Sequence, residues 1–183
     1  SCRGCDKSTA TQDQRTGESG AGGMSRRTIF SECRQYRYTL WREWDLLNSN
    51  YAMFIGLNPS TADEWKDDPT IRRCIDFSKQ WGYGALCMVN LFAFRATDPR
   101  VMMSTPRPIG EENDRWIAYC AKDAGVIVAA WGTKGQYIGR DEEVLQLVEG
   151  LTCLRLTKDG CPEHPLYLPK NLVPIEYQKA VLA

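Results

Sequence analysis

The sequence predicts an α/β fold with three layers, in which helices cover both faces of a central, mostly parallel sheet of four strands. Four short runs of aliphatic and β-branched residues are bounded by turn residues, which is typical of strands buried on both faces. Segments with apolar residues at helical spacing lie between these runs, and such alternation of strand and helix builds a parallel sheet. The 183 residues, 43% of them hydrophobic and 25% charged, match one globular domain.

The first 28 residues are expected to form a disordered tail that precedes a single domain, 29–183. Residues 1–23 are rich in Ser, Thr, Gly, Gln and charged residues and contain hardly any apolar side chain that a core could bury. The first ordered element is expected at 37–44, where apolar and polar residues alternate enough for an edge strand or one arm of a hairpin.

The remaining elements follow in order along the chain. Strands are predicted at 52–57, 85–91, 126–131 and 152–156. Helices are predicted between consecutive strands, because apolar residues recur there at helical spacing and a glycine follows each pattern, at 69–81, 116–124 and 141–149.

Eight cysteines do not make this chain a disulfide scaffold, because it is long for one and six of them lie in apolar-patterned segments, where we expect reduced core residues. Cys2 and Cys5 form a CxxC that would be half of a zinc or iron–sulfur site. No second CxxC follows, so we expect two exposed thiols, no metal and no cofactor.

Charge and hydropathy exclude some classes of protein. Lysine plus arginine (23) equals aspartate plus glutamate (23), so a polyanion would have to be held by a local basic face. The longest apolar run, 126–131, is far short of the roughly 20 residues of a membrane helix. No segment resembles a secretory signal, and we expect a cytoplasmic protein.

The predicted strands end in polar or glycine-marked loops. In an open α/β sheet the ligand crevice lies beyond the carboxyl ends of the strands, where the following loops converge. We therefore expect one binding site at a rim shared by four loops, 56–60, 90–95, 131–136 and 163–165.

Asn58 and His164 are the candidate reactive residues. Asn58 lies in a loop that Gly and Pro make tight, where an amide can orient a water but cannot take its proton. His164 is the sole histidine and precedes a proline in a polar loop, where it can hydrogen-bond or protonate an oxygen that gains charge. The structural alternatives are a turn-capping asparagine and a surface histidine.

Asn90 ends a very apolar strand, and a buried amide needs partners. Its donor and acceptor match one edge of a pyrimidine. Phe92 and Phe94 alternate along the same segment, so one would stack under the ring of a base while the other packs in the core. The alternative is that both pack in the core. The same strand is followed by a loop with three arginines, Arg95, Arg100 and Arg107, and only one nearby acidic residue, Asp98. This loop is either the best local basic face, which would bind phosphate, or simply a solvated loop.

Together these segments resemble the uracil-DNA glycosylase superfamily. Gly56–Ser60 is similar to the first motif of the mismatch-specific and single-strand-selective branches, in which an asparagine positions the attacking water. Met88–Asn90 resembles the segment whose asparagine reads the flipped base, and 126–136, ending WGxxxQ, is similar to the third strand. His164–Leu168 resembles the second motif, whose histidine contacts O2 of the base and whose loop enters the minor groove. The resemblance covers about residues 50–170.

The resemblance implies a monofunctional DNA glycosylase that flips a base out of double-stranded DNA and leaves an abasic site, acting as a monomer without a lysine nucleophile. Asn58 and His164 would be catalytic. Base or substrate contacts are implied for Gly56, Leu57, Pro59, Ser60, Asp63, Asn90, Phe92 and Phe94. DNA contacts are implied for Arg95, Arg100, Thr133, Lys134, Tyr167, Leu168 and Lys170.

Departures from the family's motifs redirect the expected substrate. Ser60 replaces a glycine or bulky aromatic and Leu166 replaces a serine, which argues against plain uracil. The GLNPSTAD signature resembles a bacterial and phage lineage, and a phage-defence enzyme that removes glucosylated hydroxymethylcytosine is a plausible relative. The acidic run 63–68 would repel phosphate, so we hypothesise that it reads a sugar on the base. Alternatives are a non-catalytic reader of modified DNA and an enzyme acting on free nucleotides.

Overall fold

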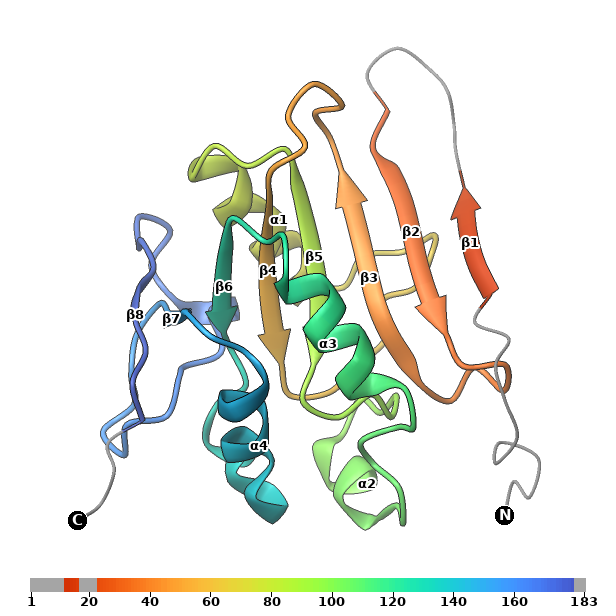
Figure 1. Cartoon of the computed structure of the whole chain (residues 1–183), viewed down its shortest axis with the longest axis vertical. Coiled ribbons are helices and arrows are strands. Elements are labelled where there is room, and N and C mark those ends of the chain that lie inside the picture. The colour runs from red at the N-terminus through yellow and green to blue at the C-terminus, as the bar shows by residue number, and fades with distance from the viewer. Residues whose placement is uncertain (1–11, 17–22, 180–183) are drawn as a thin grey trace.

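The computed structural model describes residues 12–16 and 23–179 and contains one sheet in the order β1-β2-β3-β5-β4-β6-β7-β8 (Figure 1). The strands are β1 (Gln12–Thr16), β2 (Ser25–Phe30), β3 (Arg37–Glu43), β4 (Tyr51–Gly56), β5 (Ala85–Asn90), β6 (Val126–Ala129), β7 (Leu151–Cys153) and β8 (Ile175–Glu176). The helices are α1 (Pro69–Gln80), α2 (Pro99–Ser104), α3 (Asn113–Ala121) and α4 (Arg140–Leu147), with the short 3-10 helices η1 (Thr133–Gly139) and η2 (Pro165–Tyr167).

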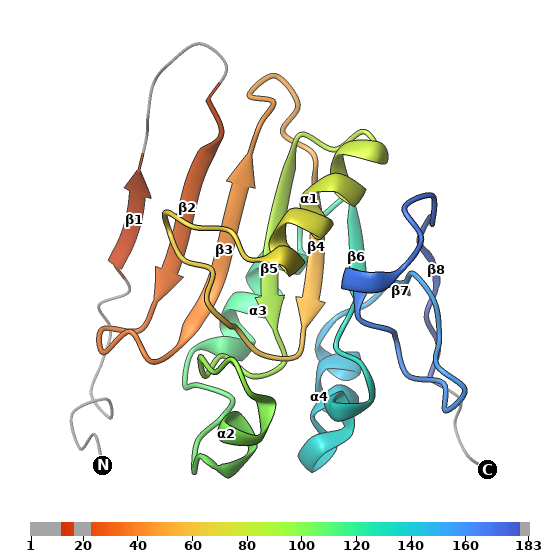
Figure 2. The ribbon, with the colours of Figure 1, turned by 180° about the vertical axis from the view of Figure 1, so that it is seen from behind.

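The predicted α/β class is confirmed, but the predicted sheet of four mostly parallel strands is wrong. The sheet has eight strands. β5, β4, β6 and β7 pair in parallel, whereas β1, β2 and β3 extend the sheet beyond β5 in antiparallel fashion and β8 pairs antiparallel with β7. Helix α1 covers one face and α3 covers the other, as the two opposite views show (Figures 1 and 2). Helix α4 lies beyond the ends of the strands, and its Val144 joins the core cluster on the α3 side.

The antiparallel strands correct two further expectations. The segment expected at an edge is β3, which pairs with both β2 and β5 and is therefore interior; only its role as a hairpin arm holds. Residues 12–16 and 25–28, expected in a disordered tail, belong to β1 and β2. Residues 1–11 and 17–22 lie outside the described part of the chain. Strand β2 was not predicted because it begins with Ser and Arg residues, which carry little strand signal.

The core has two halves, one on each face of the sheet. Along β4, Met53 and Ile55 contribute to the cluster packed under α3 and α4, while Ala52 and Phe54 contribute to the cluster under α1. Side chains of a strand alternate between faces, so a strand covered on both sides has to be apolar throughout. This explains why a continuous apolar run correctly predicted β4.

Six of the cysteines lie in residues 12–16 and 23–179. None of these six forms a disulfide, and all except Cys33 are buried. No group of His, Cys, Asp and Glu side chains in this part could hold a metal ion. Cys2 and Cys5 lie outside it. None of the described helices has the length and apolar character to cross a bilayer.

Candidate functional site

A pocket of about 250 Å³ lies at the carboxyl ends of the parallel strands. All four loops that were expected to share a rim contribute to it, since Trp131 joins side chains from the loops after β4 and β5 and from the loop that contains His164. Six of the candidate residues named from sequence line it: Gly56, Leu57, Asn58, Ser60, Asn90 and His164.

The loops after β4 and β5 are joined by backbone hydrogen bonds beyond the ends of these strands. The amide of Leu91 donates to the carbonyl of Gly56 over 2.9 Å, and the amide of Ala96 donates to the carbonyl of Pro59 over 2.9 Å. Parallel pairing is thereby continued into the rim of the pocket. The side chains of this rim are consequently held on a rigid support.

The amide of Asn58 is oriented by the same pair of loops. Its Nδ2 donates to the carbonyl of Ala96 over 2.8 Å and to that of Pro59 over 3.1 Å. Both hydrogens are used, so Oδ1 must face away from these acceptors, and no described residue donates to it. The side chain therefore does form a local backbone contact, as the structural alternative expected, but it also keeps an acceptor for a water.

Asn90 is 1% exposed and carries an unsatisfied group. Its Nδ2 has no hydrogen-bond partner among the described residues. Gly56 makes room for the amide, because a Cβ there would lie 2.8 Å from Oδ1 of Asn90 and 2.8 Å from Cε of Met88. A buried donor without a partner is costly, and a ligand acceptor in the pocket would satisfy it.

The backbone at the end of β5, at Asn90 and Leu91, is held by two residues that were not predicted from the sequence. Asn113 donates from Nδ2 to the carbonyls of Asn90 (2.9 Å) and Leu91 (3.0 Å), and Arg140 donates from Nε to that of Leu91 (2.9 Å). Both side chains are buried. They satisfy carbonyls that the end of β5 would otherwise leave without partners.

His164 lies at the rim of the pocket and is exposed. It caps η2, where its Nδ1 accepts a hydrogen bond from the amide of Leu166 over 3.3 Å. In the neutral ring the proton is then on Nε2, which is free to donate to a ligand oxygen. Partial burial lowers the pKa of His164 below its usual value, and the charge of Asp68 opposes this only in part. At neutral pH the ring is an uncharged donor.

Two charged residues also line the pocket: Arg37, which was not predicted as a site residue, and Asp68, the last residue of the acidic run that was expected to read a sugar. Arg37 begins β3, is 2% exposed, and donates from Nη1 to the carbonyl of Ala62 over 2.9 Å. Burial lowers its pKa to about 10, so it is still protonated at neutral pH. Asp68 is the N-cap of α1 and accepts from the amide of Ile71 over 2.9 Å. For Arg37 the only signal in the sequence is a charged residue at the start of a strand. Whether its side chain points inward depends on the register of that strand.

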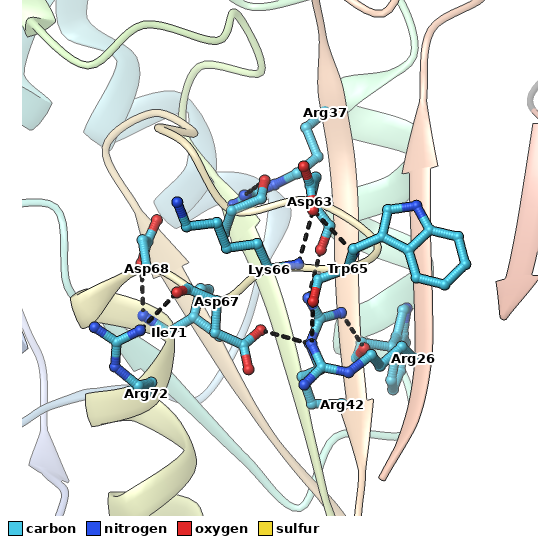
Figure 3. Close-up of polar contacts among 12 residues, drawn as sticks. Arg26, Arg37, Arg42, Asp63, Trp65, Lys66, Asp67, Asp68, Ile71 and Arg72 are labelled. Atoms are coloured by element: carbon cyan, nitrogen blue, oxygen red, sulfur yellow. Dashed lines mark hydrogen bonds and ion pairs between the residues drawn. The ribbon is translucent and has the colours of Figure 1, made fainter. Parts of the chain in front are cut away.

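Of the acidic run 63–68, only Asp68 lines the pocket. Asp63 and Asp67 instead make polar contacts within the protein (Figure 3). Oδ1 of Asp63 accepts from the amides of Trp65 and Lys66, both over 2.8 Å. Asp67 pairs with Arg42 over 2.7 Å and Glu64 with Arg34 over 2.8 Å, which attaches the loop to β3 and to the turn between β2 and β3. Asp63 does not line the pocket, and its Oδ1 turns back into its own loop, so its role in the substrate site stays a prediction.

The two phenylalanines after β5 make packing contacts, as the alternative of core packing for both expects, and the stacking of one of them under a base stays a prediction. Phe92 is fully buried, with its ring centroid 5.8 Å from that of Tyr137. Phe94 packs edge-to-face against Tyr36 at 5.6 Å. Neither they nor Pro59 line the pocket. The aromatic side chain that does is Trp131, whose ring would overlap a Cβ on Gly135.

Two of the expected DNA contacts are engaged inside the protein. Arg95 is half-buried, with its guanidinium 4.8 Å from the centre of the Phe30 ring and Nη1 donating to the carbonyl of Arg34 over 3.2 Å. Leu168 is 3% exposed and packs under α1, so it cannot be a projecting wedge.

The other expected DNA contacts are at the surface. Tyr167 is 92% exposed and is the apolar side chain that projects from the loop after His164. Arg100 is exposed and pairs with Asp98 over 2.7 Å. The remaining candidates share an exposed position: Thr133, Lys134 and Lys170.

The fold and the pocket define an α/β protein with a ligand-sized site at the carboxyl edge of parallel strands. The chain belongs to a family described as "Protein of unknown function (DUF1643)", whose model matches residues 37–166. The matched segment begins at Arg37 and ends two residues after His164, so it contains every residue that lines the pocket. No curated protein and no solved structure matches the chain.

Proposed function

We propose that the protein is a monofunctional DNA glycosylase that takes an extruded base into this pocket and hydrolyses its N-glycosidic bond. The observation that carries the proposal is that Asn58, Asn90 and His164 line one pocket. Each has a polar atom without a recorded protein partner among the described residues: Oδ1, Nδ2 and Nε2, respectively. The parallel order β5-β4-β6-β7, with helices on both faces, supports a domain of the uracil-DNA glycosylase type.

In this mechanism the bond between C1′ and the base nitrogen breaks first, and its electron pair leaves with the base. Nε2–H of His164 donates a hydrogen bond to the base oxygen that gains negative charge. Oδ1 of Asn58 holds a water whose oxygen then bonds to C1′, and the water's proton passes to the departed base or to solvent. Asn58 needs no basicity, because a sugar cation is captured easily. The products are a free base and an abasic site.

The pocket has a volume of about 250 Å³, which is enough for a pyrimidine ring but below the roughly 300–1,000 Å³ of pockets that enclose drug-sized ligands. A sugar carried on the base would therefore have to extend from the pocket toward its rim. As the preferred substrate we propose a modified pyrimidine, glucosylated hydroxymethylcytosine of phage DNA, removed by a monomeric cytoplasmic enzyme in defence against phages. Since only Asp68 of the acidic run lines the pocket, it is the carboxylate that we now assign to the sugar hydroxyls.

The test uses phage DNAs that contain cytosine, hydroxymethylcytosine or glucosylated hydroxymethylcytosine. Each is incubated with the protein and then treated with alkali, which cleaves abasic sites. Scission of the glucosylated DNA alone, lost in Asn58→Ala and His164→Ala while DNA binding persists, supports the proposal. Binding to modified DNA without scission would instead identify a reader.

An enzyme acting on free nucleotides is the second candidate. It is favoured because the loop after β5 offers a weaker basic face than the sequence predicted. Arg95 covers Phe30 and Arg100 is paired with Asp98, so fewer free cations than expected surround the pocket. Incubation with the corresponding nucleotides, followed by chromatography of the released base, separates this function from action on DNA.

A further inference from the structure

Three arginine side chains are among the largest fully buried ones: Arg37, Arg42 and Arg140. Two of them have carboxylate partners. Arg42 pairs with Asp67 over 2.7 Å, and Arg140 pairs with Glu143 over 2.8 Å and with Asp114.

Arg37 differs, because no described carboxylate lies within ion-pair distance of it. Its one recorded hydrogen bond goes to the carbonyl of Ala62, and its buried Nε has no partner among the described residues. A buried charge ordinarily needs a counter-charge or full hydrogen bonding, so an arginine without either is an exception that requires an explanation.

Arg37 is also the one of the three that lines the pocket. Two further features there favour negative charge. The unpartnered Nδ2 of Asn90 is a second buried donor. The first turn of α1, a helix of twelve residues, contributes Thr70 and Ile71 to the lining, and the amino end of a helix carries partial positive charge.

The fixed charges around Arg37 do not cancel its own. Asp68 and Asp63 act to raise its pKa, whereas Arg95 and Arg42 act to lower it. Asp68 already accepts from the amide of Ile71, and Asp63 from those of Trp65 and Lys66.

We propose that Arg37 is the anion-binding group of the pocket, and that its ligand is a heterocyclic base carrying negative charge on a ring nitrogen and its adjoining oxygen. This inference rests on the proposed function, in which the base leaves with the electron pair of the broken bond. Arg37 would donate hydrogen bonds to that anion and transfer no proton. His164 is a neutral donor, and charged donors form the stronger hydrogen bonds, so most of the stabilisation of the leaving base is assigned to Arg37.

The probe is 5-nitrouracil, whose nitro group makes the ring N–H acidic enough to ionise at pH 8, with neutral uracil as its comparison. Binding is measured by calorimetry at pH 8, where His164 is uncharged. We expect the wild-type protein to bind the anion at least about tenfold more tightly, the effect of one charge-assisted hydrogen bond. Arg37→Met should remove this preference and Arg37→Lys should keep part of it, whereas Arg115→Gln, which changes an exposed arginine of α3, should keep all of it.

Equal affinity of the wild-type protein for the two probes, or a preference that persists in folded Arg37→Met, would overturn the inference. Should Arg37→Met fail to fold by circular dichroism, a series of 5-substituted uracils with graded ring acidity is bound to the wild-type protein at pH 8. Affinity must then rise with the ionised fraction, and a flat series overturns the inference.

The same data separate this inference from the proposed function. Anion binding that depends on Arg37, without any abasic sites in the DNA assay, supports the anion subsite and refutes the glycosylase. Abasic sites combined with equal probe affinities refute the subsite alone.

Discussion

The pocket and the neighbouring acidic loop, 63–67, are both rich in polar side chains, but they differ in how these groups are satisfied. In the acidic loop, Asp63 accepts from two backbone amides and Asp67 from two arginines (Figure 3). In the pocket, Nε of Arg37 and Nδ2 of Asn90 are buried without partners among the described residues. Satisfied groups attach the loop to the sheet, whereas unsatisfied ones are available to a ligand.

The largest expected effect is a loss of stability when the acidic loop is detached from the sheet. Asp67→Ala leaves the buried guanidinium of Arg42 without its carboxylate, and losing one partner of a buried ion pair costs about 3–5 kcal/mol. Chemical denaturation should show this loss in the free energy of unfolding. The exposed Asp76→Ala on α1 is the control and should change it by less than about 0.5 kcal/mol. A small effect of Asp67→Ala would mean that the loop is not held by this pair.

The second effect concerns the pocket. Asn58→Ala removes the acceptor for the water, and a misplaced reactant costs about a hundredfold in rate. Single-turnover excision on the DNA that the panel identifies should fall by that factor, while DNA affinity stays within about threefold, because Asn58 contacts the reacting water and not the phosphates. Asn50→Ala, at an exposed asparagine, is the matched control. Full activity of Asn58→Ala would remove this residue from the mechanism.

The third effect tests how closely the pocket is packed. Gly56→Ala places a Cβ 2.8 Å from Oδ1 of Asn90, and overpacking of this kind costs about 1–3 kcal/mol. The Asn90 amide would have to shift, so affinity for the free base 5-hydroxymethylcytosine should fall along with stability. Calorimetry and thermal melting measure the two. Unchanged affinity for this base would show that Asn90 does not contact it.

The smallest effect is a shift of the pH profile. Protonation of His164 at Nδ1 would abolish its acceptance of the Leu166 amide, so excision should fall on the acid side of the lowered pKa, below pH 6.5. Asp68 is the charge that raises this pKa, and Asn still caps a helix. Asp68→Asn should therefore move the acid limb to still lower pH. A limb that moves upward would contradict this assignment.

The parts of the fold that the sequence predicted are those with a local signal. β4, β5, β6 and β7 are short apolar runs between turn residues, and α1 begins at Pro69 behind the capping Asp68. β1 and β2 lack such a signal, because their sequences, QDQRT and SRRTIF, are mostly polar. Their strand structure depends on the pairing of β1 with β2 and of β2 with β3, which are tertiary contacts.

The site divides in the same way. Asn58, Asn90 and His164 follow strand ends or a tight turn and could be found from position alone. Arg37 could not, because whether a charge at the start of a strand points inward depends on register. Phe92, Phe94 and Leu168 show the converse, since an apolar side chain next to a binding loop is equally suited to the core.

The position of Arg37 on β3 has a consequence for any attempt to simplify the protein. A version trimmed to its four parallel strands and their covering helices would retain the amides and the imidazole, yet it would lose the cation that the antiparallel hairpin supplies. The hairpin also carries Arg42, which fastens the segment preceding α1. A strand that looks like an accessory to a minimal scaffold therefore provides the buried cation of its binding site.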